Sequence, residues 1–371
     1  MTRDLMVFGE DWGGLPSSTQ YLMAQLAKSR KVLWINSIGL RQPTCSLRDL
    51  KRVLHKLCSG IEDTKSTLPA NTFRVLKAKT IPAPRTPIAR AVASKLLALQ
   101  IKPLMLRMDL HKPIFWTSLA TAVDVKQYFK ALPMVYYCGD DFSSLPGVDH
   151  ETIAQHEQAL VVAADLIITA SATLAAKFPR HKTQILPHGV DFELFSQPAK
   201  RATDLPNNGK RTAGFYGSIE AWLDLRLLEE VAKALPQWNF VFIGKTKINT
   251  QTLQALSNVY FLGAKPHGLL PQYSQHWDVS LLPFKPCAQI EACNPLKLRE
   301  YLATGKPIIS TVFPAMQAYQ HIIPVTDAPT MIQALSNLPR DSSRVKTHQN
   351  DLSTASWQTR AATLSGWLNA L

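Results

Sequence analysis

Residues 294 to 311 read Asn294-Pro-Leu-Lys-Leu-Arg-Glu-Tyr-Leu-Ala-Thr-Gly-Lys-Pro-Ile-Ile-Ser-Thr311, the pattern of a helix followed by a strand. Asn294 is a residue type that caps helix N-termini, and Pro295 suits the first helical position. Gly305 suits the left-handed position after a helix, and Pro307 prevents the helix from continuing. The apolar run that closes the segment predicts a buried strand. This order of elements is typical of a parallel α/β domain.

The same alternation of apolar runs, turns and helical periods extends along the chain and predicts an α/β fold class with doubly wound parallel sheets. Strands are expected at residues 5–8, 32–35, 114–116, 134–138, 166–169, 184–186, 212–216, 240–243, 259–262, 279–282 and 308–311. Between the strands at 212–216 and 240–243, the apolar spacing from Leu225 to Leu235 predicts a helix that Pro236 ends.

The length predicts two domains, because 371 residues exceed what one hydrophobic core usually organises. We expect Rossmann-like domains at residues 1–196 and 197–351, facing a cleft, with the polar stretch 197–211 as a linker. Residues 352–371 are expected to form a helix that packs back on the first domain. Ligands of such folds bind at the carboxyl ends of the strands.

The net charge of +14 is concentrated in one region. Residues 41–112 hold 15 Lys and Arg against 4 Asp and Glu, whereas the chain after Val190 holds 17 against 13. Residues 46–59 and 88–108 are expected to form basic amphipathic helices, the second interrupted at Pro103. Such helices can lie on an anionic membrane surface; the alternative is that their apolar faces pack on the sheet.

Other patterns narrow the function classes. The five cysteines form no CxxC pair and no spaced His/Cys set, so we expect neither a zinc site nor a disulfide framework, and a reducing cytoplasm fits best. The apolar run at residues 5–8 is too short for a signal peptide or a membrane span. No motif indicates binding to nucleic acid.

Lys297 and Glu300 are three residues apart and share a face of the predicted helix. This helix follows the strand at 279–282 through a loop, so its free N–H groups and positive dipole end are expected to face the ligand. A diphosphate would be stabilised there, with Lys297 at the phosphates and Glu300 accepting hydrogen bonds from both ribose hydroxyls. The alternative is a buried helix whose charged side chains reach solvent.

This helix resembles the donor-binding helix of glycosyltransferases with the GT-B architecture, especially the retaining group related to family 4 and bacterial exopolysaccharide transferases. In that family the helix carries the second Glu of an E-x7-E pair, which Glu300 matches. The first would fall at position 292, which is Ala, and Glu291 is one residue away. Further landmarks occur in the family's order over residues 134–311, namely Asp140-Asp141-Phe142-Ser143, Pro187-His188-Gly189-Val190-Asp191, Phe215-Tyr216-Gly217-Ser218, Leu262-Gly263 and Leu282-Pro283-Phe284.

The resemblance and the strand ends together give the candidate site residues. Donor binding is expected from Gly217, Ser218, Lys245, Lys285, Asn294, Pro295, Leu296, Lys297 and Glu300. Asp140 and Asp141 are the candidates for orienting or deprotonating an acceptor hydroxyl, and Gly13, Gly14 and His188 for an acceptor or phosphate loop. Each has a structural alternative: a helix cap for an Asp, a simple turn for a Gly pair, a buried side chain for the His, and a solvated lysine.

The expected function is therefore a retaining, metal-independent glycosyltransferase with no cofactor. Its donor would be a nucleotide sugar, with UDP or GDP as the leaving nucleotide, and its acceptor a lipid-linked or surface polysaccharide. It would be cytoplasmic and peripheral at the inner face of the plasma membrane. Two alternatives stay open: a sugar-nucleotide 2-epimerase of the same architecture, and a non-catalytic basic protein that binds membranes.

Overall fold

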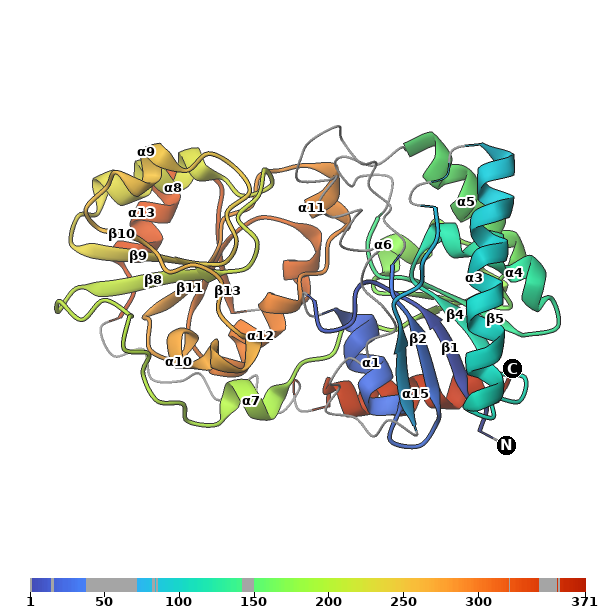
Figure 1. Cartoon of the computed structure of the whole chain (residues 1–371). Coiled ribbons are helices and arrows are strands. Elements are labelled where there is room, and N and C mark those ends of the chain that lie inside the picture. Colours follow the sequence, from blue (N-terminus) through green and yellow to red (C-terminus); the bar gives the residue numbers. More distant parts are fainter. Residues whose placement is uncertain are drawn as a thin grey trace. The chain divides into compact units, whose positions relative to one another are not determined.

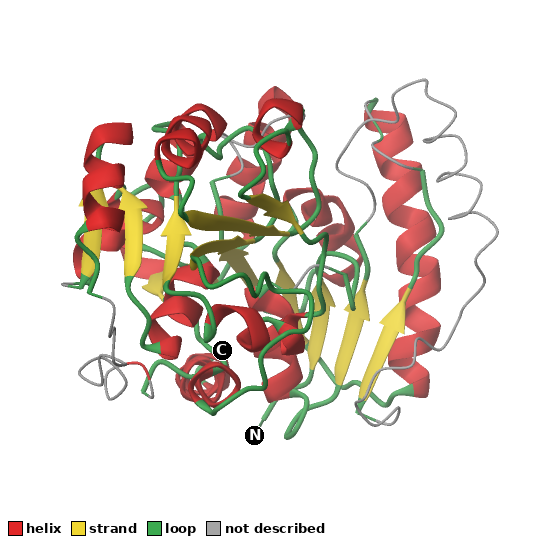
Figure 2. Cartoon of the chain, turned by 90° about the vertical axis from the view of Figure 1, so that its left-hand side faces the viewer, coloured by secondary structure: helices red, strands yellow, loops and turns green. Residues whose placement is uncertain are grey.

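The computed structural model describes residues 2–14, 17–37, 72–81, 84, 86–141, 150–319, 321–339, 352 and 354–371. It consists of two compact α/β units, which contain residues 1–187 with 357–371, and residues 188–356. Each has one sheet in which every paired strand is parallel (Figures 1 and 2). The predicted fold class of two parallel-sheet α/β domains is confirmed.

The first unit contains a seven-stranded sheet in the order β3-β2-β1-β4-β5-β6-β7. Its strands are β1 (Leu5–Phe8), β2 (Val32–Ile35), β3 (Phe73–Leu76), β4 (Ile114–Thr117), β5 (Met134–Cys138), β6 (Leu166–Thr169) and β7 (Thr183–Ile185). Its helices are α1 (Ser18–Leu26), α3 (Pro87–Arg107), α4 (Val123–Lys126), α5 (His150–Ala163), α6 (Ala172–Ala175) and α15 (Trp357–Asn369).

Alternate side chains of β1 point to the two faces of this sheet, and both faces are covered. Met6 and Phe8 belong to the core that also contains Leu97 of α3 and Leu160 of α5. On α1, Leu22 and its neighbours are buried, and α1 in turn packs against α15. The double cover explains why β1 and β2 are apolar throughout rather than alternating.

The second unit contains a six-stranded sheet in the order β10-β9-β8-β11-β12-β13. Its strands are β8 (Arg211–Tyr216), β9 (Trp238–Ile243), β10 (Val259–Phe261), β11 (Val279–Leu282), β12 (Ile308–Thr311) and β13 (Ile322–Val325). Its helices are α7 (Phe192–Ser196), α8 (Leu225–Ala234), α9 (Gln251–Gln254), α10 (Pro271–Ser274), α11 (Ala288–Ala292), α12 (Leu296–Thr304) and α13 (Ala328–Ser336).

Two edge strands, β3 and β13, were not predicted from the sequence. β3 is interrupted by Arg74 and is only partly buried, as an edge strand permits. β13 contains Pro324, which lacks an N–H donor and is tolerated in a strand that is paired on one side only. An edge strand needs less continuous apolar sequence than a central one, so both give a weak signal.

The helix expected at 88–108 is α3, which continues through Pro103 instead of being interrupted there. Proline removes the hydrogen bond to the carbonyl of Leu99, but both residues are exposed on the outer face, where water can satisfy that oxygen. The helix expected at 46–59 lies outside the described residues. No helix in the described part of the chain is both long and apolar enough to cross a membrane.

The division between the units falls earlier than the predicted boundary, at His188 rather than at residue 197. The expected linker at 197–211 is packed into the second unit, where Ala202 and Leu205 are buried. Gln275 holds the preceding turn by donating to the carbonyls of Phe195 and Gln197, at 2.8 and 2.7 Å.

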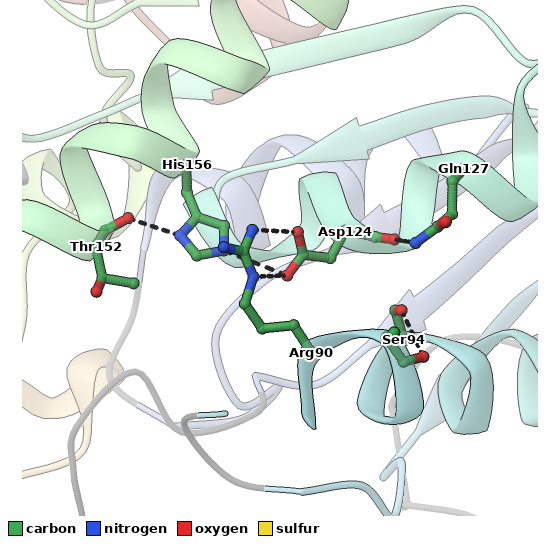
Figure 3. A network of polar contacts seen from close by, with 7 residues as sticks. Arg90, Ser94, Asp124, Gln127, Thr152 and His156 are labelled. Atoms are coloured by element: carbon green, nitrogen blue, oxygen red, sulfur yellow. Dashed lines mark hydrogen bonds and ion pairs between the residues drawn. The ribbon is translucent and has the colours of Figure 1, made fainter. Parts of the chain in front are cut away.

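A partly buried ionic cluster joins α3, α4 and α5 in the first unit (Figure 3). Arg90 of α3 donates two hydrogen bonds to the Asp124 carboxylate of α4, at 2.8 and 2.6 Å. His156 of α5 contacts the same carboxylate at 3.3 Å and the Thr152 carbonyl at 2.7 Å. Although burial opposes ionisation, Arg90 and His156 lower the pKa of Asp124 to about 2. The cluster therefore fixes α3 against its neighbours.

We expect Asp124→Asn to lower the free energy of unfolding at neutral pH by about 2 kcal/mol, because a pKa shift of nearly two units is lost. In the native protein this contribution is complete above about pH 4 and disappears as the pH falls through 2. Urea titrations between these limits check the prediction. A variant whose stability falls with acid as steeply as that of the native chain would contradict it.

Candidate functional site

The carboxyl end of β8 carries Tyr216, Gly217 and Ser218 in the second unit. Gly217 has φ of 136°, a conformation that favours glycine, and its N–H donates to the Ile243 carbonyl of β9 at 2.8 Å. A Cβ at Gly217 would overlap Nζ of Lys297, and one at Gly244 would overlap the Gly217 carbonyl. The two glycines therefore let the ends of β8 and β9 and the α12 lysine approach one another.

Lys297, in the first turn of α12, points its ammonium group at three aromatic rings. Nζ lies 4.5 Å from the ring centroid of Phe215, 4.9 Å from that of Trp222 and 5.8 Å from that of Phe284. In the described part of the chain Lys297 forms no salt bridge. Rings of this kind attract a cation without neutralising it. The site therefore holds a positive charge in an apolar setting.

Burial lowers the pKa of Lys297 to about 8, while Cys293, Glu300 and Glu220 partly oppose this shift. A lysine with such a pKa is still mostly charged at neutral pH. An anion bound beside it would stabilise the charged form and raise its pKa again. The arrangement favours binding of an anionic group such as a phosphate.

Glu300 lies one turn further along α12 and is held at both carboxylate oxygens. Tyr216 Oη donates to Oε2 at 2.6 Å, and His267 Nε2 lies 2.7 Å from Oε1. The neighbouring Tyr301 fixes the strand end, because its Oη accepts from the backbone N–H of Tyr216 at 2.9 Å. Glu300 is thus aligned before any ligand binds, and each of its oxygens retains a further lone pair.

The start of α12 differs from the prediction. Pro295, not Asn294, is the N-cap residue, no side chain caps the helix, and the first helical residue is Leu296. The Asn294 side chain instead accepts a hydrogen bond from the buried Arg299 at 2.9 Å. The prediction for the other end is confirmed, since Gly305 adopts the left-handed conformation with φ of 72°.

The two further lysine candidates follow strand ends but are exposed. Lys245 comes shortly after β9, and its carbonyl accepts from the N–H of Ile219 at 3.0 Å. Lys285 comes shortly after β11, and its N–H donates to the Trp222 carbonyl at 2.8 Å. The Lys285 backbone therefore borders the three rings around Lys297, whereas the Lys245 backbone lies beside Ile219. Both lysines are exposed.

In the first unit, the loop after β1 is tied to the start of α1. Gly13 has φ of 76° and donates to Gln20 Oε1 at 3.1 Å, while the N–H of Gly14 closes a turn on Asp11. Gln20 also donates to Glu10 at 3.3 Å. Burial raises the pKa of Glu10, with Asp11 and Asp140 adding to the effect. The glycine pair thus lies beside a carboxyl group with a high proton affinity.

Asp140 and Asp141 follow β5 and have different surroundings. Asp141 is paired with Lys177. Asp140 is exposed to solvent, yet desolvation by the surrounding protein raises its pKa, and the negative charge of Asp141 adds to this effect. In the described residues no group of three or more His, Cys, Asp or Glu side chains could hold a metal ion. The two aspartates thus differ, because desolvation favours the protonated form of Asp140 whereas Asp141 is held in an ion pair.

His188, the remaining candidate, is only 7% exposed. A buried side chain was the structural alternative for this residue, and its role in an acceptor or phosphate loop stays a prediction. It begins the second unit, directly before the isolated bridge between Val190 and Ser356.

The groups that surround Lys297 and Glu300 were not predicted from the sequence. Phe215 and Tyr216 belong to the landmark Phe215-Tyr216-Gly217-Ser218, and a pair of aromatic residues at a strand end was the signal that could have revealed them. His267 follows β10 by several residues and packs edge-on against Phe195, with ring centroids 5.4 Å apart. No spacing rule connects it with Glu300, because the two are joined only through the packing of the second sheet.

The chain is similar in sequence and in fold to known glycosyltransferases. Residues 210–341 match the family described as glycosyl transferases group 1. A protein of Bacillus subtilis strain 168, named as the teichuronic acid biosynthesis glycosyltransferase TuaH, is 34% identical over 148 residues. That match covers 38% of this chain and 37% of the relative, so the chain spans little more than a third of the length of the relative it matches.

Solved structures match over the whole chain at low identity. HepE of Anabaena, determined with UDP and glucose, superposes with a TM-score of 0.69 at 15% identity and covers 100% of both chains. Sucrose-phosphate synthase of Thermosynechococcus elongatus gives 0.71 at 15% identity, over 99% of this chain and 98% of the other. The fold is therefore that of GT-B glycosyltransferase structures, and residues 210–341 of the second unit are similar in sequence to group 1.

Proposed function

We propose that the chain is a glycosyltransferase that takes a sugar from a nucleotide-diphosphate donor bound by the second unit. The observation that carries the proposal is the pairing of Lys297 and Glu300 on α12 at the end of β8, within the part of the chain that matches group 1. One residue supplies a positive charge and the other an aligned carboxylate, one helical turn apart. These are the groups that a diphosphate and a ribose require.

Lys297 binds the diphosphate in this proposal. Gly217 lets the lysine ammonium lie against the end of β8, and the N-terminal end of α12 adds the positive end of a helix dipole. As the bond between the sugar and the phosphate breaks, negative charge develops on the leaving diphosphate. Lys297 and the helix end stabilise that charge, which is the task that a metal ion performs in other transferases. The reaction is accordingly proposed to be metal-independent, and no cofactor is proposed.

Glu300 binds the ribose hydroxyls. Tyr216 and His267 each form a hydrogen bond to one carboxylate oxygen, so each oxygen keeps a further lone pair that can accept from a ribose hydroxyl. A uridine nucleotide is the proposed donor, because HepE was solved with UDP-glucose and a trehalose-6-phosphate protein of Escherichia coli with UDP-2-fluoro glucose. A hexose is the corresponding sugar. GDP is the alternative leaving nucleotide.

The first unit is proposed to bind the acceptor. Asp140 accepts a hydrogen bond from the attacking hydroxyl, and Asp141 is held in place by its ion pair with Lys177. Gly13 and Gly14 shape the neighbouring turn. The acceptor is proposed to be a lipid-linked or surface polysaccharide, which the name of the Bacillus relative supports. Retention of configuration, in which a donor phosphate oxygen takes the hydroxyl proton, completes the proposal. The place of reaction is the cytoplasmic face of the plasma membrane.

A thermal-shift panel of UDP, GDP, ADP, TDP and CMP tests the donor site, with Glu300→Ala as the variant. We expect UDP to raise the melting temperature of the native chain and to leave that of the variant unchanged, because the ribose contacts are lost. Glu229→Ala is the matched control, since Glu229 is a helical glutamate that forms an ion pair with the exposed Lys233. Stabilisation by none of the nucleotides would sink the proposal, as would equal stabilisation of the Glu300 variant.

A further inference from the structure

Helix α3 carries apolar side chains on two opposite faces. Its inner face packs into the core of the first unit through Ala93, Leu97, Ala98 and Ile101. Its outer face presents large apolar side chains that are between 40% and 82% exposed, namely Ile88, Val92, Leu96, Leu99 and Leu106. We call these five residues the outer stripe. A helix that only covered a sheet would need the inner face alone.

The outer stripe is continuous and narrow. With 3.6 residues per turn its five members fall within an arc of about 80°, and the stripe from Ile88 to Leu106 is about 27 Å long. Nine large hydrophobic side chains are exposed in the described part of the chain, and five of them form this stripe. Scattered exposed apolar residues need no explanation, but a concentrated patch indicates a binding surface.

The charge beside the outer stripe is of one sign. Lys95 and Lys102 lie along one side of it and Arg107 along the other, and all three are exposed. Helix α3 contains no Asp or Glu. Its remaining cation, Arg90, turns inward to Asp124 (Figure 3). The surface that α3 offers outward is therefore apolar along its middle and positive along its edges.

We infer that the outer stripe docks on an anionic lipid surface, with α3 lying in the plane of the interface. Its apolar side chains would enter the boundary of the acyl chains, and Lys95, Lys102 and Arg107 would contact the acidic headgroups. A second copy of the chain is a poorer occupant. A two-fold interface through this stripe would bring like-charged lysines together with no carboxylate on the helix to compensate.

This inference deepens the proposed function, since a lipid-linked acceptor is met at a membrane surface, but it uses no residue of the donor site. The two can therefore fail separately. A chain that binds UDP and ignores vesicles would refute the inference alone, and a chain that binds vesicles and no nucleotide would refute the proposed donor site alone.

Flotation of the full chain with lipid vesicles at low salt provides the test. We expect the chain to float with phosphatidylcholine vesicles that contain about one third phosphatidylglycerol, and at least tenfold less with phosphatidylcholine alone. The combined variant Ile88→Ser, Leu99→Ser and Leu106→Ser is expected to lose vesicle binding about tenfold or more. The combined variant Lys95→Glu and Lys102→Glu is expected to lose the preference for anionic lipid.

Val162→Ser with Lys130→Glu is the matched control, because both residues are exposed in the same unit but lie outside α3. This control should float as the native chain does. UDP-induced thermal shifts should be unchanged in all three variants, which would show that they fold. The inference is overturned if the native chain ignores anionic vesicles, or if the stripe variant binds them as well as the native chain does. A concentration-dependent dimer that the stripe variant abolishes, without vesicle binding, would assign the face to a second copy and overturn it too.

Discussion

Replacement of Lys297 by Met is expected to weaken the binding of UDP about 30- to 150-fold, since a charge-assisted contact with phosphate is worth about 2–3 kcal/mol. The same change should leave the fold intact or stabilise it. Methionine has a similar length, and its thioether suits a cage formed by Phe215, Trp222 and Phe284. Isothermal calorimetry with UDP and thermal melting without ligand measure the two effects. Loss of affinity with no loss of stability separates a binding role from a structural one.

The pH dependence of UDP affinity provides a second measurement on this residue. The pKa of Lys297 is about 8 in the free protein and rises when the diphosphate binds. Between about pH 7, where the terminal phosphate of UDP is mostly ionised, and about pH 8 the affinity should therefore be nearly constant, and it should fall by up to tenfold per pH unit above about pH 8. In Lys297→Met this slope should vanish. Lys233→Met, which changes an exposed lysine of α8, should behave as the native chain does. A native affinity that stays level well above pH 8 would rule out Lys297 as the phosphate ligand.

Replacement of Arg30 by Ala is expected to lower the free energy of unfolding by about 2–4 kcal/mol, because several buried acceptors lose their donor together. Arg30 is 3% exposed and donates to the Arg3 carbonyl at 3.0 Å. It also donates to Ser365 Oγ at 2.6 Å and to Asn369 Oδ1 at 2.8 Å, both on α15. The guanidinium group therefore fastens the C-terminal helix to the first unit.

Amide hydrogen exchange would show which part of the chain Arg30→Ala destabilises. In Arg30→Ala the amides of α15 should lose most of their protection, while those of the second unit should keep theirs. The stacking of Tyr21 on Trp357, with ring centroids 4.8 Å apart, should be disturbed and change the tryptophan fluorescence. Lys28→Ala is the matched control, because Lys28 is an exposed neighbour whose ammonium group donates to Gln25 of the same helix. Unchanged protection of α15 would contradict the assigned role of Arg30.

The central strands could be predicted from the sequence because they are buried, whereas the edge strands could not. Central strands such as β1, β5 and β11 are buried from end to end and are mostly apolar, because helices cover the sheet, and this pattern can be recognised in the sequence. The edge strands β3 and β13 are paired on one side and tolerate Arg74 and Pro324, so the same pattern does not reveal them. Helix α3 contains Pro103, and only its position on the exposed face explains why the helix continues.

The sequence by itself determined the stretch from Lys297 to Gly305, because the spacing of two charged residues, a helix and its glycine stop are local properties. Which groups surround those charges was decided by the tertiary structure. Tyr216, His267 and the aromatic cage come from different strand ends, and only the order of the strands in the sheet brings them to α12. The same holds for Asn294, a capping residue by type, which bonds Arg299 because packing offers it a buried guanidinium group. Local sequence specifies elements and their ends, whereas contacts between distant residues depend on how the whole sheet is assembled.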